Sequence, residues 1–225
     1  MKEVKLKTGI PRGIEVMMAA AGLLLTSPFL ALSALLIKLT SRGPVLFKQK
    51  RVGLHGKHFT LLKLRTMTTG ENGPKITATN DARITSIGKI LRKTKVDELP
   101  GLWNVMRGDM SFVGPRPEVP ELVDLNDPRW KEILTALPGI TDPVTLRLRN
   151  EEMLLASVDD KERFYRENLQ PYKLNGYVEF VRGKNWKSDI RIIIQTIKAI
   201  VFPRSATPPT AAEMGWPPAG HIGSV

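Results

Sequence analysis

No cysteine occurs among the 225 residues of the sequence. This absence excludes disulfide bonds, thiolate-bound zinc, iron–sulfur clusters and cysteine nucleophiles. Histidine is scarce as well, because only His55, His58 and His221 are present and none forms a ligand-spaced pair with a carboxylate. A histidine-based metal site is therefore not expected. Hydrophobic residues still make up 42% of the chain, which is enough for a core, and the length suits one domain.

Carboxylates are missing from a long N-terminal stretch, and none occurs between Glu15 and Glu71. The formal net charge of +12 is therefore unevenly spread. Residues 1–70 hold 12 Lys and Arg against two acids, or +10, whereas residues 71–225 hold 22 against 20, or +2. A basic excess of this kind predicts a polyanionic partner, which is nucleic acid, an anionic membrane surface or a phosphorylated substrate.

An uncharged run of 22 residues, from Val16 to Ile37, lies inside the basic segment. As a helix it is long enough to cross a hydrocarbon layer of roughly 30 Å. The apolar region of a cleaved signal peptide is shorter, usually about 7–15 residues. We therefore expect membrane insertion. Nucleic acid is the least favoured partner, because the positive charge surrounds this run and only 6% of the residues are aromatic.

The run is interrupted in its middle by Ser27-Pro28. Proline removes a backbone donor and clashes with the preceding turn, so a kink is expected there. Basic residues flank the run on both sides, Lys2, Lys5, Lys7 and Arg12 before it and Lys38, Arg42, Lys48, Lys50 and Arg51 after it. The positive-inside tendency places both flanks in the cytoplasm. A helix that enters the membrane, breaks and returns satisfies both features, although spanning helices also tolerate proline.

A β-hairpin is predicted after the membrane run. Residues 45–52 and 59–66 have the composition of strands and flank a turn-forming segment at 53–56. A period of two places Lys63 and Arg65 on the same face of the second strand. Two neighbouring cations could bind phosphate oxygens, and the alternative is a solvated basic edge strand. Residues 68–80 follow as a polar loop.

Two adjacent carboxylates, Asp97 and Glu98, follow a helix that the apolar spacing predicts around residues 84–91. Asp97 fits a helix N-cap with Pro100 in the first turn, so capping alone would explain the pair. The other interpretation is a phosphate-handling site, because Arg92, Lys93 and Lys95 stand directly before the acids. Those cations would keep Asp97 ionised and nucleophilic.

Arg116 stands between Pro115 and Pro117. The prolines restrict its backbone, and a guanidinium offers a planar fork of donors that suits phosphate. A rigid surface turn is the alternative interpretation. Both remain open from the residues alone.

The C-terminal third predicts two helices and a tail. Residues 147–168 are highly charged and expected to be helical. Ser188 is expected to cap an amphipathic helix that ends before Pro203 and either contacts a membrane or packs on the core. Residues 204–225 are rich in proline and alanine, so a disordered tail is expected there.

Several motifs stand together in one order. They are the apolar segment broken at Ser27-Pro28, Gly43-Pro44-Val45-Leu46-Phe47-Lys48-Gln49, Lys63-Leu64-Arg65-Thr66-Met67, Asp81-Ala82-Arg83-Ile84-Thr85, Leu91-Arg92-Lys93-Thr94, Asp97-Glu98-Leu99-Pro100, Gly108-Asp109-Met110-Ser111 and Gly114-Pro115-Arg116-Pro117. This combination resembles the bacterial sugar transferases, the monotopic phosphoglycosyl transferases that initiate polysaccharide and glycoconjugate assembly. The resemblance extends from about residue 10 to residue 203.

The resemblance implies that a sugar 1-phosphate moves from a UDP-sugar to a polyprenol phosphate such as undecaprenyl phosphate, with release of UMP and a requirement for Mg²⁺. Asp97 would form a covalent aspartyl-phosphosugar. Glu98 would either position Mg²⁺, together with Asp97, or manage a proton. Lys63, Arg92 and Arg116 match family positions near the phosphates.

Further residues match the family pattern with a less specific role. Asp81 and Arg83 would support the site, as would Arg65, although the first two could equally be an internal ion pair. Ser27-Pro28 matches the break of the family's re-entrant membrane helix. This match favours re-entry over a kinked spanning helix.

The expected architecture is a mainly helical α+β monotopic membrane protein. Residues 1–40 form the re-entrant helix and its basic flank, and residues 41–203 form a cytoplasmic catalytic domain with a small β-hairpin and amphipathic interfacial helices. The expected location is the cytoplasmic face of the bacterial inner membrane. The expected partners are a UDP-sugar, a polyprenol phosphate, membrane lipid and, optionally, a second copy of the chain, but not nucleic acid.

Two other function classes fit part of the pattern. A noncatalytic module that binds anionic lipid would explain the basic half and the apolar run, but gives no reason for Asp97-Glu98 beside Arg92 and Arg116. A conventional glycosyltransferase would release UDP and would usually carry an Asp-x-Asp motif, which is absent from the sequence.

Overall fold

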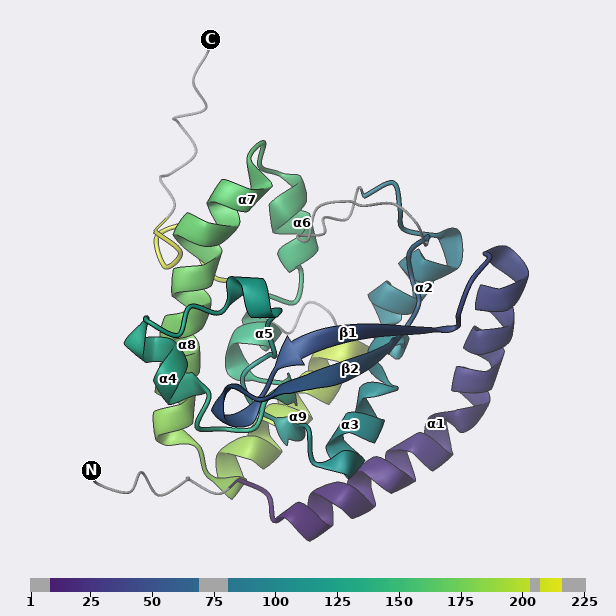
Figure 1. Cartoon of the computed structure of the whole chain (residues 1–225), viewed down its shortest axis with the longest axis horizontal. Helices are drawn as coiled ribbons and strands as arrows, with labels where there is room; N and C mark the ends of the chain where they lie inside the picture. Colours follow the sequence, from purple (N-terminus) through teal and green to yellow (C-terminus); the bar gives the residue numbers. More distant parts are fainter. Residues whose placement is uncertain (1–8, 69–80, 203–206, 216–225) are drawn as a thin grey trace.

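The computed structural model describes residues 9–68, 81–202 and 207–215. It is mainly helical with two small sheets (Figure 1), which confirms the expected α+β class. The helices are α1 (Arg12–Thr40), α2 (Ser86–Thr94), α3 (Gly101–Arg107), α4 (Pro128–Ile133), α5 (Pro143–Arg147), α6 (Glu151–Ala156), α7 (Lys161–Phe164), α8 (Gln170–Gly183) and α9 (Trp186–Val201). Short helical turns are η1 (Leu54–Gly56), η2 (Val96–Glu98), η3 (Pro120–Leu122) and the π-helical η4 (Tyr165–Leu169). The loop expected at 68–80 lies outside the described residues apart from residue 68.

Helix α1 is the one described helix whose length and composition would allow it to cross a membrane. Most of its apolar side chains are exposed, for example Leu24 at 74% and Phe29 at 63%. The helix continues through Pro28, so the expected break is a bend within one helix. Figure 1 shows α1 changing direction about midway along its length. A bend without a break is what a missing proline N–H and its steric clash produce when the neighbouring hydrogen bonds persist.

Both ends of α1 are attached to the globular part of the molecule. At its start, Arg12 donates to the carbonyl of Met110 at 3.3 Å, and the buried Glu15 accepts a hydrogen bond from the backbone of β3 (Ser111–Val113) at 3.0 Å. At its end, Arg65 donates to the carbonyl of Ser41 at 2.9 Å. The helix therefore leaves the globular part and comes back to it (Figure 1).

The predicted hairpin is present. Strand β1 (Leu46–Val52) pairs antiparallel with β2 (His58–Leu64), and η1 makes the turn between them. A second, parallel pair joins β3 to β4 (Gly139–Thr141). Each sheet has only two strands, so neither is stable alone, and both depend on the helices packed around them.

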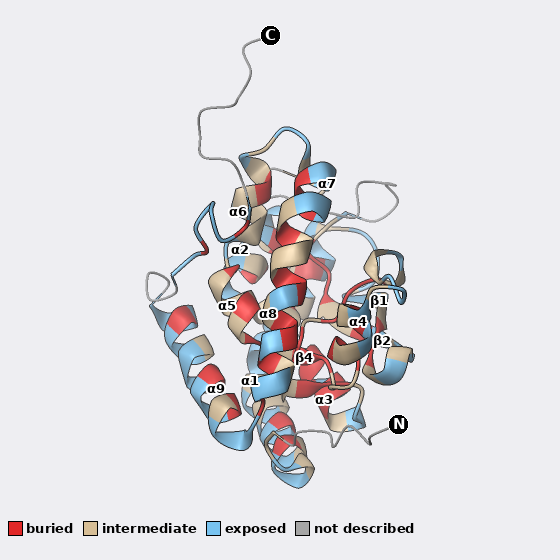
Figure 2. Cartoon of the chain, turned by 90° about the vertical axis from the view of Figure 1, so that its left-hand side faces the viewer, coloured by how far each residue is buried: buried red, intermediate tan, exposed pale blue. Residues whose placement is uncertain are grey.

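The largest apolar cluster lies between α4, α5, η4 and α8, where Trp130, Leu169 and Tyr177 are almost fully buried. Figure 2 shows the buried side of α8 and the exposed surface of α9. A second cluster joins Ala19 of α1 to Leu102 of α3, so the start of the apolar helix is part of the core. Burial of each large apolar side chain contributes about 1.5–3 kcal/mol, which makes these clusters the main support of the fold.

The C-terminal tail differs from the expectation where it is described. Met214 is buried in the main core cluster, and the Asn168 amide donates to its carbonyl at 3.2 Å. Glu213 forms an ion pair with Arg147 at 2.8 Å. Residues 207–215 are therefore ordered by contacts with α5 and η4, which composition alone does not reveal. The other residues of the expected tail, 204–206 and 216–225, lie outside the described residues.

Two helix predictions in the C-terminal third were also inaccurate. Residues 147–168 are not one helix but the end of α5, then α6, α7 and most of η4, and the Asp160 side chain begins α7 by accepting from the Arg163 backbone at 2.9 Å. Helix α9 is capped by Asn185, with Ser188 completing a reciprocal capping box.

Candidate active site

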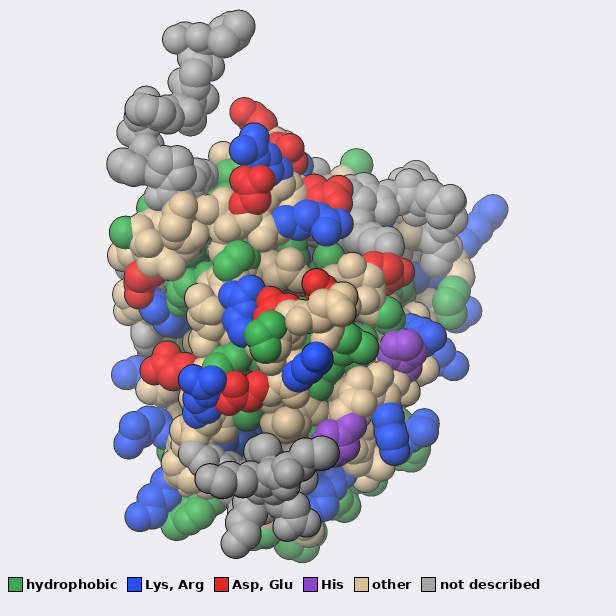
Figure 3. Space-filling model, turned by 60° about the vertical axis from the view of Figure 1, so that its left-hand side comes forward, with side chains coloured by type: hydrophobic (Ala, Val, Ile, Leu, Met, Phe, Trp, Pro, Cys, Tyr) green, Lys and Arg blue, Asp and Glu red, His purple; other side chains and the backbone are tan. Residues whose placement is uncertain are grey.

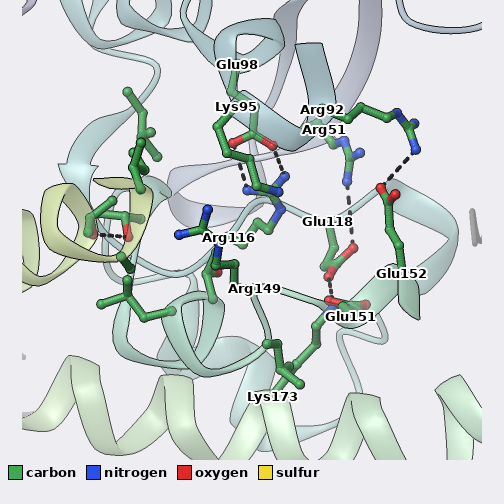
Figure 4. A pocket seen from close by; sticks show the side chains of 18 of the residues that line it. Arg51, Arg92, Lys95, Glu98, Arg116, Glu118, Arg149, Glu151, Glu152 and Lys173 are labelled. Atoms are coloured by element: carbon green, nitrogen blue, oxygen red, sulfur yellow. Dashed lines mark hydrogen bonds and ion pairs between the residues drawn. The ribbon is translucent and has the colours of Figure 1, made fainter. Parts of the chain in front are cut away.

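One carboxylate and two cations converge from three separate parts of the chain. Glu98 of η2 contacts Lys63 of β2, with 3.1 Å between Nζ and Oε1. Arg116, in the loop after β3, contacts both oxygens of Glu98 at 2.5 and 3.3 Å. This two-pronged contact is the geometry in which a guanidinium binds a carboxylate most strongly (Figure 4). Three of the residues expected at the site are therefore brought together.

The local structure explains why these groups meet. Asn104 of α3 is almost fully buried, and its side chain donates to the Thr60 carbonyl at 2.8 Å and accepts from the Leu62 N–H at 3.1 Å. This pair of hydrogen bonds joins α3, and with it η2, to strand β2 beside Lys63. The flanking prolines restrict the backbone of Arg116, and its two contacts with Glu98 hold the guanidinium in place.

Charge pairing sets the ionisation of this cluster. Burial by itself would raise the pKa of Glu98, but Arg116 and Lys63 outweigh burial and hold that pKa well below its ordinary value. The Glu98 carboxylate raises the pKa of Arg116. Burial lowers the pKa of Lys63, with Glu98 opposing the effect. Glu98 is thus an anion shared by two cations.

Asp97 behaves in the opposite way. Its side chain is 7% exposed, and its Oδ1 has no hydrogen-bond partner among the described residues. Burial, and next the negative charge of Glu98, raise the pKa of Asp97 to about 6. Lys63, Lys95 and Arg92 lower this pKa, but they do not outweigh desolvation and the adjacent carboxylate.

Asp97 is also not a helix N-cap. It lies within η2, and α3 begins four residues later, after Pro100. A buried carboxylate oxygen without a partner costs free energy, so capping cannot be the reason for this residue. The arrangement leaves an oxygen of Asp97 without a partner, whereas Glu98 is paired with two cations.

Arg92 lies on a different wall of the site. Its guanidinium pairs with Glu152 of α6 at 2.9 Å and donates to the Thr66 hydroxyl at 3.0 Å. Helix α2 can approach this closely because residue 88 is glycine, and a Cβ there would stand 2.0 Å from the Thr66 carbonyl oxygen. Arg92 therefore faces the same space as Glu98 without contacting it.

The three supporting residues are distributed away from the cluster. Arg65 is buried, and its guanidinium is taken up by carbonyls at the end of α1, so its role is to anchor that helix. Asp81 and Arg83 form an ion pair at 2.7 Å, and the Arg83 side chain lowers the pKa of Asp81. The internal ion pair, one of the two interpretations of this motif, is thus confirmed. Ser27 and Pro28 lie on α1.

Two connected spaces adjoin the cluster. The smaller space, named the inner cavity, has a volume of about 390 Å³ and is lined by Glu98, Arg116, Glu118 and Lys173 among others. The outer cleft has a volume of about 1720 Å³ and includes Lys63 and Asp97 in its wall. The inner cavity has the size of a small-molecule site, and the outer cleft is larger than most.

A buried polar network at one end of the inner cavity was missed by the sequence patterns. Lys173 of α8 contacts Glu151 at 2.9 Å and Glu118 at 3.5 Å, and the Tyr165 hydroxyl donates to Glu118 at 3.1 Å. Arg51 of β1 contacts the same Glu118 at 3.7 Å (Figure 4). These residues are separated by up to about 120 positions, so no local motif connects them.

The fold and the site define a class of protein. The molecule combines an exposed apolar helix attached at both ends with a cation-lined cleft whose wall holds a buried carboxylate with one unpartnered oxygen. This is the arrangement of a membrane-associated enzyme for anionic substrates. Residues 6–203 match the family of bacterial sugar transferases. The chain belongs to this family, and the resemblance noted in its motifs is confirmed.

Three relatives illustrate the family. The chain is 36% identical over 195 residues to the UDP-glucose:undecaprenyl-phosphate glucose-1-phosphate transferase of Caulobacter vibrioides, which covers 84% of this chain and 69% of the relative. It is 42% identical over 120 residues to the UDP-N-acetylgalactosamine-undecaprenyl-phosphate N-acetylgalactosaminephosphotransferase of Aeromonas hydrophila. This match covers 52% of this chain and 28% of the relative. It is 36% identical over 204 residues to the undecaprenyl-phosphate glucose phosphotransferase of Komagataeibacter xylinus. This match covers 87% of this chain and 36% of the relative. The chain thus spans only about a third of the last two proteins.

Proposed function

We propose that this chain transfers a sugar 1-phosphate from a UDP-sugar to a polyprenol phosphate and releases UMP. The observation that carries the proposal is Asp97, a buried carboxylate with one unpartnered oxygen and a pKa of about 6, next to the engaged Glu98. The curated relatives named above act on undecaprenyl phosphate and support the same acceptor class here.

The proposed reaction has two displacements at one phosphorus atom. In the first, a carboxylate oxygen of Asp97 attacks the phosphorus that bears the sugar, and the bond from that phosphorus to the bridging oxygen breaks. UMP leaves with the bridging oxygen and its electron pair, and the sugar phosphate remains as an acyl phosphate on Asp97. With a pKa of about 6, most of the Asp97 carboxyl is deprotonated at neutral pH and available as nucleophile.

In the second displacement, an oxygen of the polyprenol phosphate attacks the same phosphorus. The bond to Asp97 breaks, its carboxylate is regenerated, and the product is a polyprenol diphosphate sugar. Lys63 and Arg116 stand beside Glu98 on the same wall as Asp97, where their charge can offset the negative charge of the phosphates. Glu98 keeps both cations in place for this task.

Magnesium is part of the proposal. The unpartnered Oδ1 of Asp97 and the adjacent Glu98 carboxylate are oxygen donors of the kind that Mg²⁺ uses together with substrate phosphates. No cluster of three or more acidic or histidine side chains that could hold a metal occurs in residues 9–68, 81–202 and 207–215. The two carboxylates would therefore hold Mg²⁺ jointly with the diphosphate, and the ion would neutralise charge on the leaving UMP.

We place the protein on the cytoplasmic face of the bacterial inner membrane, with α1 as a re-entrant helix. Both ends of α1 are attached to the globular part, through Arg12 at the start and through Arg65 at the end. This supports re-entry, because a straight spanning helix would carry one end across the bilayer. The polyprenol tail stays in lipid and its phosphate lies at the interface, where a soluble UDP-sugar can also arrive.

The product of the reaction separates this proposal from its alternatives. Purified protein is incubated with Mg²⁺, polyprenol phosphate and a panel of UDP-sugars, and the released nucleotide is identified by chromatography. UMP is the expected product, whereas UDP would indicate a conventional glycosyltransferase. Release of neither nucleotide with any donor would favour the noncatalytic lipid-binding module.

Asp97→Asn tests the nucleophile. We expect a loss of UMP release of at least about a thousandfold, because an amide oxygen cannot replace a carboxylate in covalent catalysis. Asp159→Asn is the matched control, since it makes the same change at an exposed position outside both cavities. Unchanged UMP release in Asp97→Asn would contradict the assignment.

A further inference from the structure

Most cations that line the inner cavity are paired with a carboxylate. Arg51 and Lys173 face Glu118, Arg92 faces Glu152, and Arg116 faces Glu98. Two others differ: the side chains of Lys95 and Arg149 form no ion pair or hydrogen bond with any described residue. Both also line the outer cleft, so they stand where the two spaces join. Lys95 lies near enough to Asp97 and Glu98 to lower their pKa values, but it forms an ion pair with neither. Two half-buried cations that are not paired with a carboxylate favour an anion at this junction.

The backbone of Lys95 is unusual for its residue type. It follows the end of α2 in the left-handed region, with φ 60° and ψ 14°. A residue other than glycine or asparagine costs roughly 1 kcal/mol there, and such strain is found preferentially at functional positions. The turn leads directly into η2, so Lys95 stands two residues before Asp97.

Arg149 reaches the same space from the opposite side. It lies in the short connection between α5 and α6, and its side chain lines both the inner cavity and the outer cleft. Figure 4 shows Lys95, Arg116 and Arg149 directed into one region below Glu98. No local pattern distinguishes Arg149 from its charged neighbours in the sequence.

The surroundings indicate which anion fits. Beyond Lys95 and Arg149, the outer cleft continues along exposed apolar side chains, among them Phe47 at 45%, Ile90 at 59% and Met153 at 60% exposed. A nucleotide has no apolar chain to lay there, whereas a lipid phosphate does. Two cations also match the nearly two negative charges of a phosphate monoester at neutral pH.

We propose that Lys95 and Arg149 form a subsite for the phosphate of the lipid acceptor, separate from the Lys63–Arg116 pair on Glu98. This inference rests on the proposed function. The subsite places an acceptor oxygen beside Asp97, where the second displacement needs it, and directs the lipid chain along Phe47 and Ile90 toward the membrane.

The test uses Lys95→Asn and Arg149→Gln in the full chain. Asparagine tolerates the left-handed backbone, so Lys95→Asn removes the charge without adding strain. Lys131→Gln and Arg166→Gln are matched controls, because both lie outside the two cavities and are exposed. The KM values for polyprenol phosphate and for the UDP-sugar are measured separately.

Each variant is expected to raise the KM for polyprenol phosphate by about tenfold or more, because it loses one charge-assisted hydrogen bond to the acceptor phosphate. The KM for the UDP-sugar should stay within about twofold of the unchanged protein. A raised KM for the UDP-sugar with an unchanged KM for the acceptor would overturn the inference and assign the two cations to the nucleotide. Unchanged values for both substrates would overturn it as well.

A binding measurement keeps the subsite testable without catalysis. The ³¹P NMR signal of polyprenol phosphate in detergent micelles is titrated with protein in the absence of UDP-sugar, and inorganic phosphate is titrated in parallel. A lipid phosphate subsite is supported if the unchanged protein binds polyprenol phosphate more tightly than inorganic phosphate and if both variants bind polyprenol phosphate more weakly. Equal binding by all variants contradicts it. If the unchanged protein transfers no sugar phosphate, the proposed function fails while this titration still decides the subsite.

Discussion

At the scale of single residues, Asp97 and Glu98 show how neighbours in sequence can have opposite ionisation. Glu98 is held charged by Arg116 and Lys63, whereas burial and the Glu98 charge raise the pKa of Asp97 to about 6. The charge of Glu98 thus makes the Asp97 carboxylate a stronger base. Among carboxylates, the stronger base is the stronger nucleophile. This division of roles depends on which of the two side chains reaches the cations.

The raised pKa of Asp97 predicts a stability effect. Because the folded-state pKa of about 6 exceeds the ordinary value of 3.8, this group favours folding most below pH 3.8 and loses that contribution as the pH rises through 6. Asp97→Asn should therefore raise the free energy of unfolding at neutral pH by up to about 3 kcal/mol. The gain should shrink toward zero near pH 4.

Denaturant unfolding of the purified protein in detergent, followed by circular dichroism at both pH values, measures this difference. Asp159→Asn again serves as the exposed control and should change stability little. A variant of Asp97 that is less stable than the unchanged protein at neutral pH would show that the carboxylate is stabilised in the fold and not strained by burial.

At the scale of elements, α1 combines an exposed apolar surface with attachment at both ends. Glu15 at its start and Arg65 at its end are buried polar groups committed to backbone partners. Buried polar groups are costly when unpaired, so these contacts define where the helix leaves and rejoins the globular part. The bend in the middle lets one helix of 29 residues serve both attachments.

Re-entry of α1 predicts that both of its flanks lie on one side of the membrane. The chain has no cysteine, so single cysteines report position without background. Gly13→Cys has free space around its side chain, and Lys57→Cys is exposed on the globular part. In right-side-out spheroplasts, a membrane-impermeant maleimide should label neither variant until the cells are lysed.

Labelling of Gly13→Cys, but not Lys57→Cys, in intact spheroplasts would indicate a helix that spans the membrane. Labelling of both would place the globular part outside the cytoplasm. The apolar length of α1 permits both a spanning and a re-entrant arrangement, and the labelling pattern tells them apart.

At the scale of the whole molecule, the proposed membrane contact would combine the basic half of the sequence with the exposed apolar helices. The helices α1 and α9 both expose apolar side chains, with Leu24 at 74% and Ile194 at 60% exposed. On the face drawn in Figure 3, acidic side chains are in view only above the lower edge, whereas Lys and Arg also occur along that edge. On a membrane, electrostatic attraction to anionic lipid and apolar insertion would reinforce one another.

These two contributions can be separated by extraction of membranes. At about 1 M salt the Debye length falls to about 3 Å and electrostatic attachment is screened, but the protein should stay in the membrane fraction because α1 remains inserted. The double variant Leu24→Arg with Phe29→Arg should become extractable by salt, since each arginine in the bilayer costs about 2.5–3.5 kcal/mol. Leu125→Arg is the control, because Leu125 is equally apolar and 55% exposed but lies outside α1 and α9. Retention of the double variant at high salt would show that α1 is not the anchor.

The elements that were predicted correctly are those with a local cause. The apolar run of α1, the hairpin around residues 53–56 and the helix α2 follow from hydrophobic period and turn residues, and these signals act over a few positions. The residues 147–168 were predicted as one helix because charge and helix propensity are uniform there. The caps that divide them, such as Asp160, compete with that propensity only when the chain is packed.

The sequence by itself determined the long apolar helix, the hairpin and, through the order of its motifs, the family. It also identified Lys63, Glu98 and Arg116 as residues of one site, but not the contacts among them. Only the tertiary structure decided that Glu98 is engaged while Asp97 Oδ1 is not, and that Arg149 faces the same space as Lys95. The physical reason is that ionisation and pairing depend on burial and on partners far along the chain, which no local pattern of residues records.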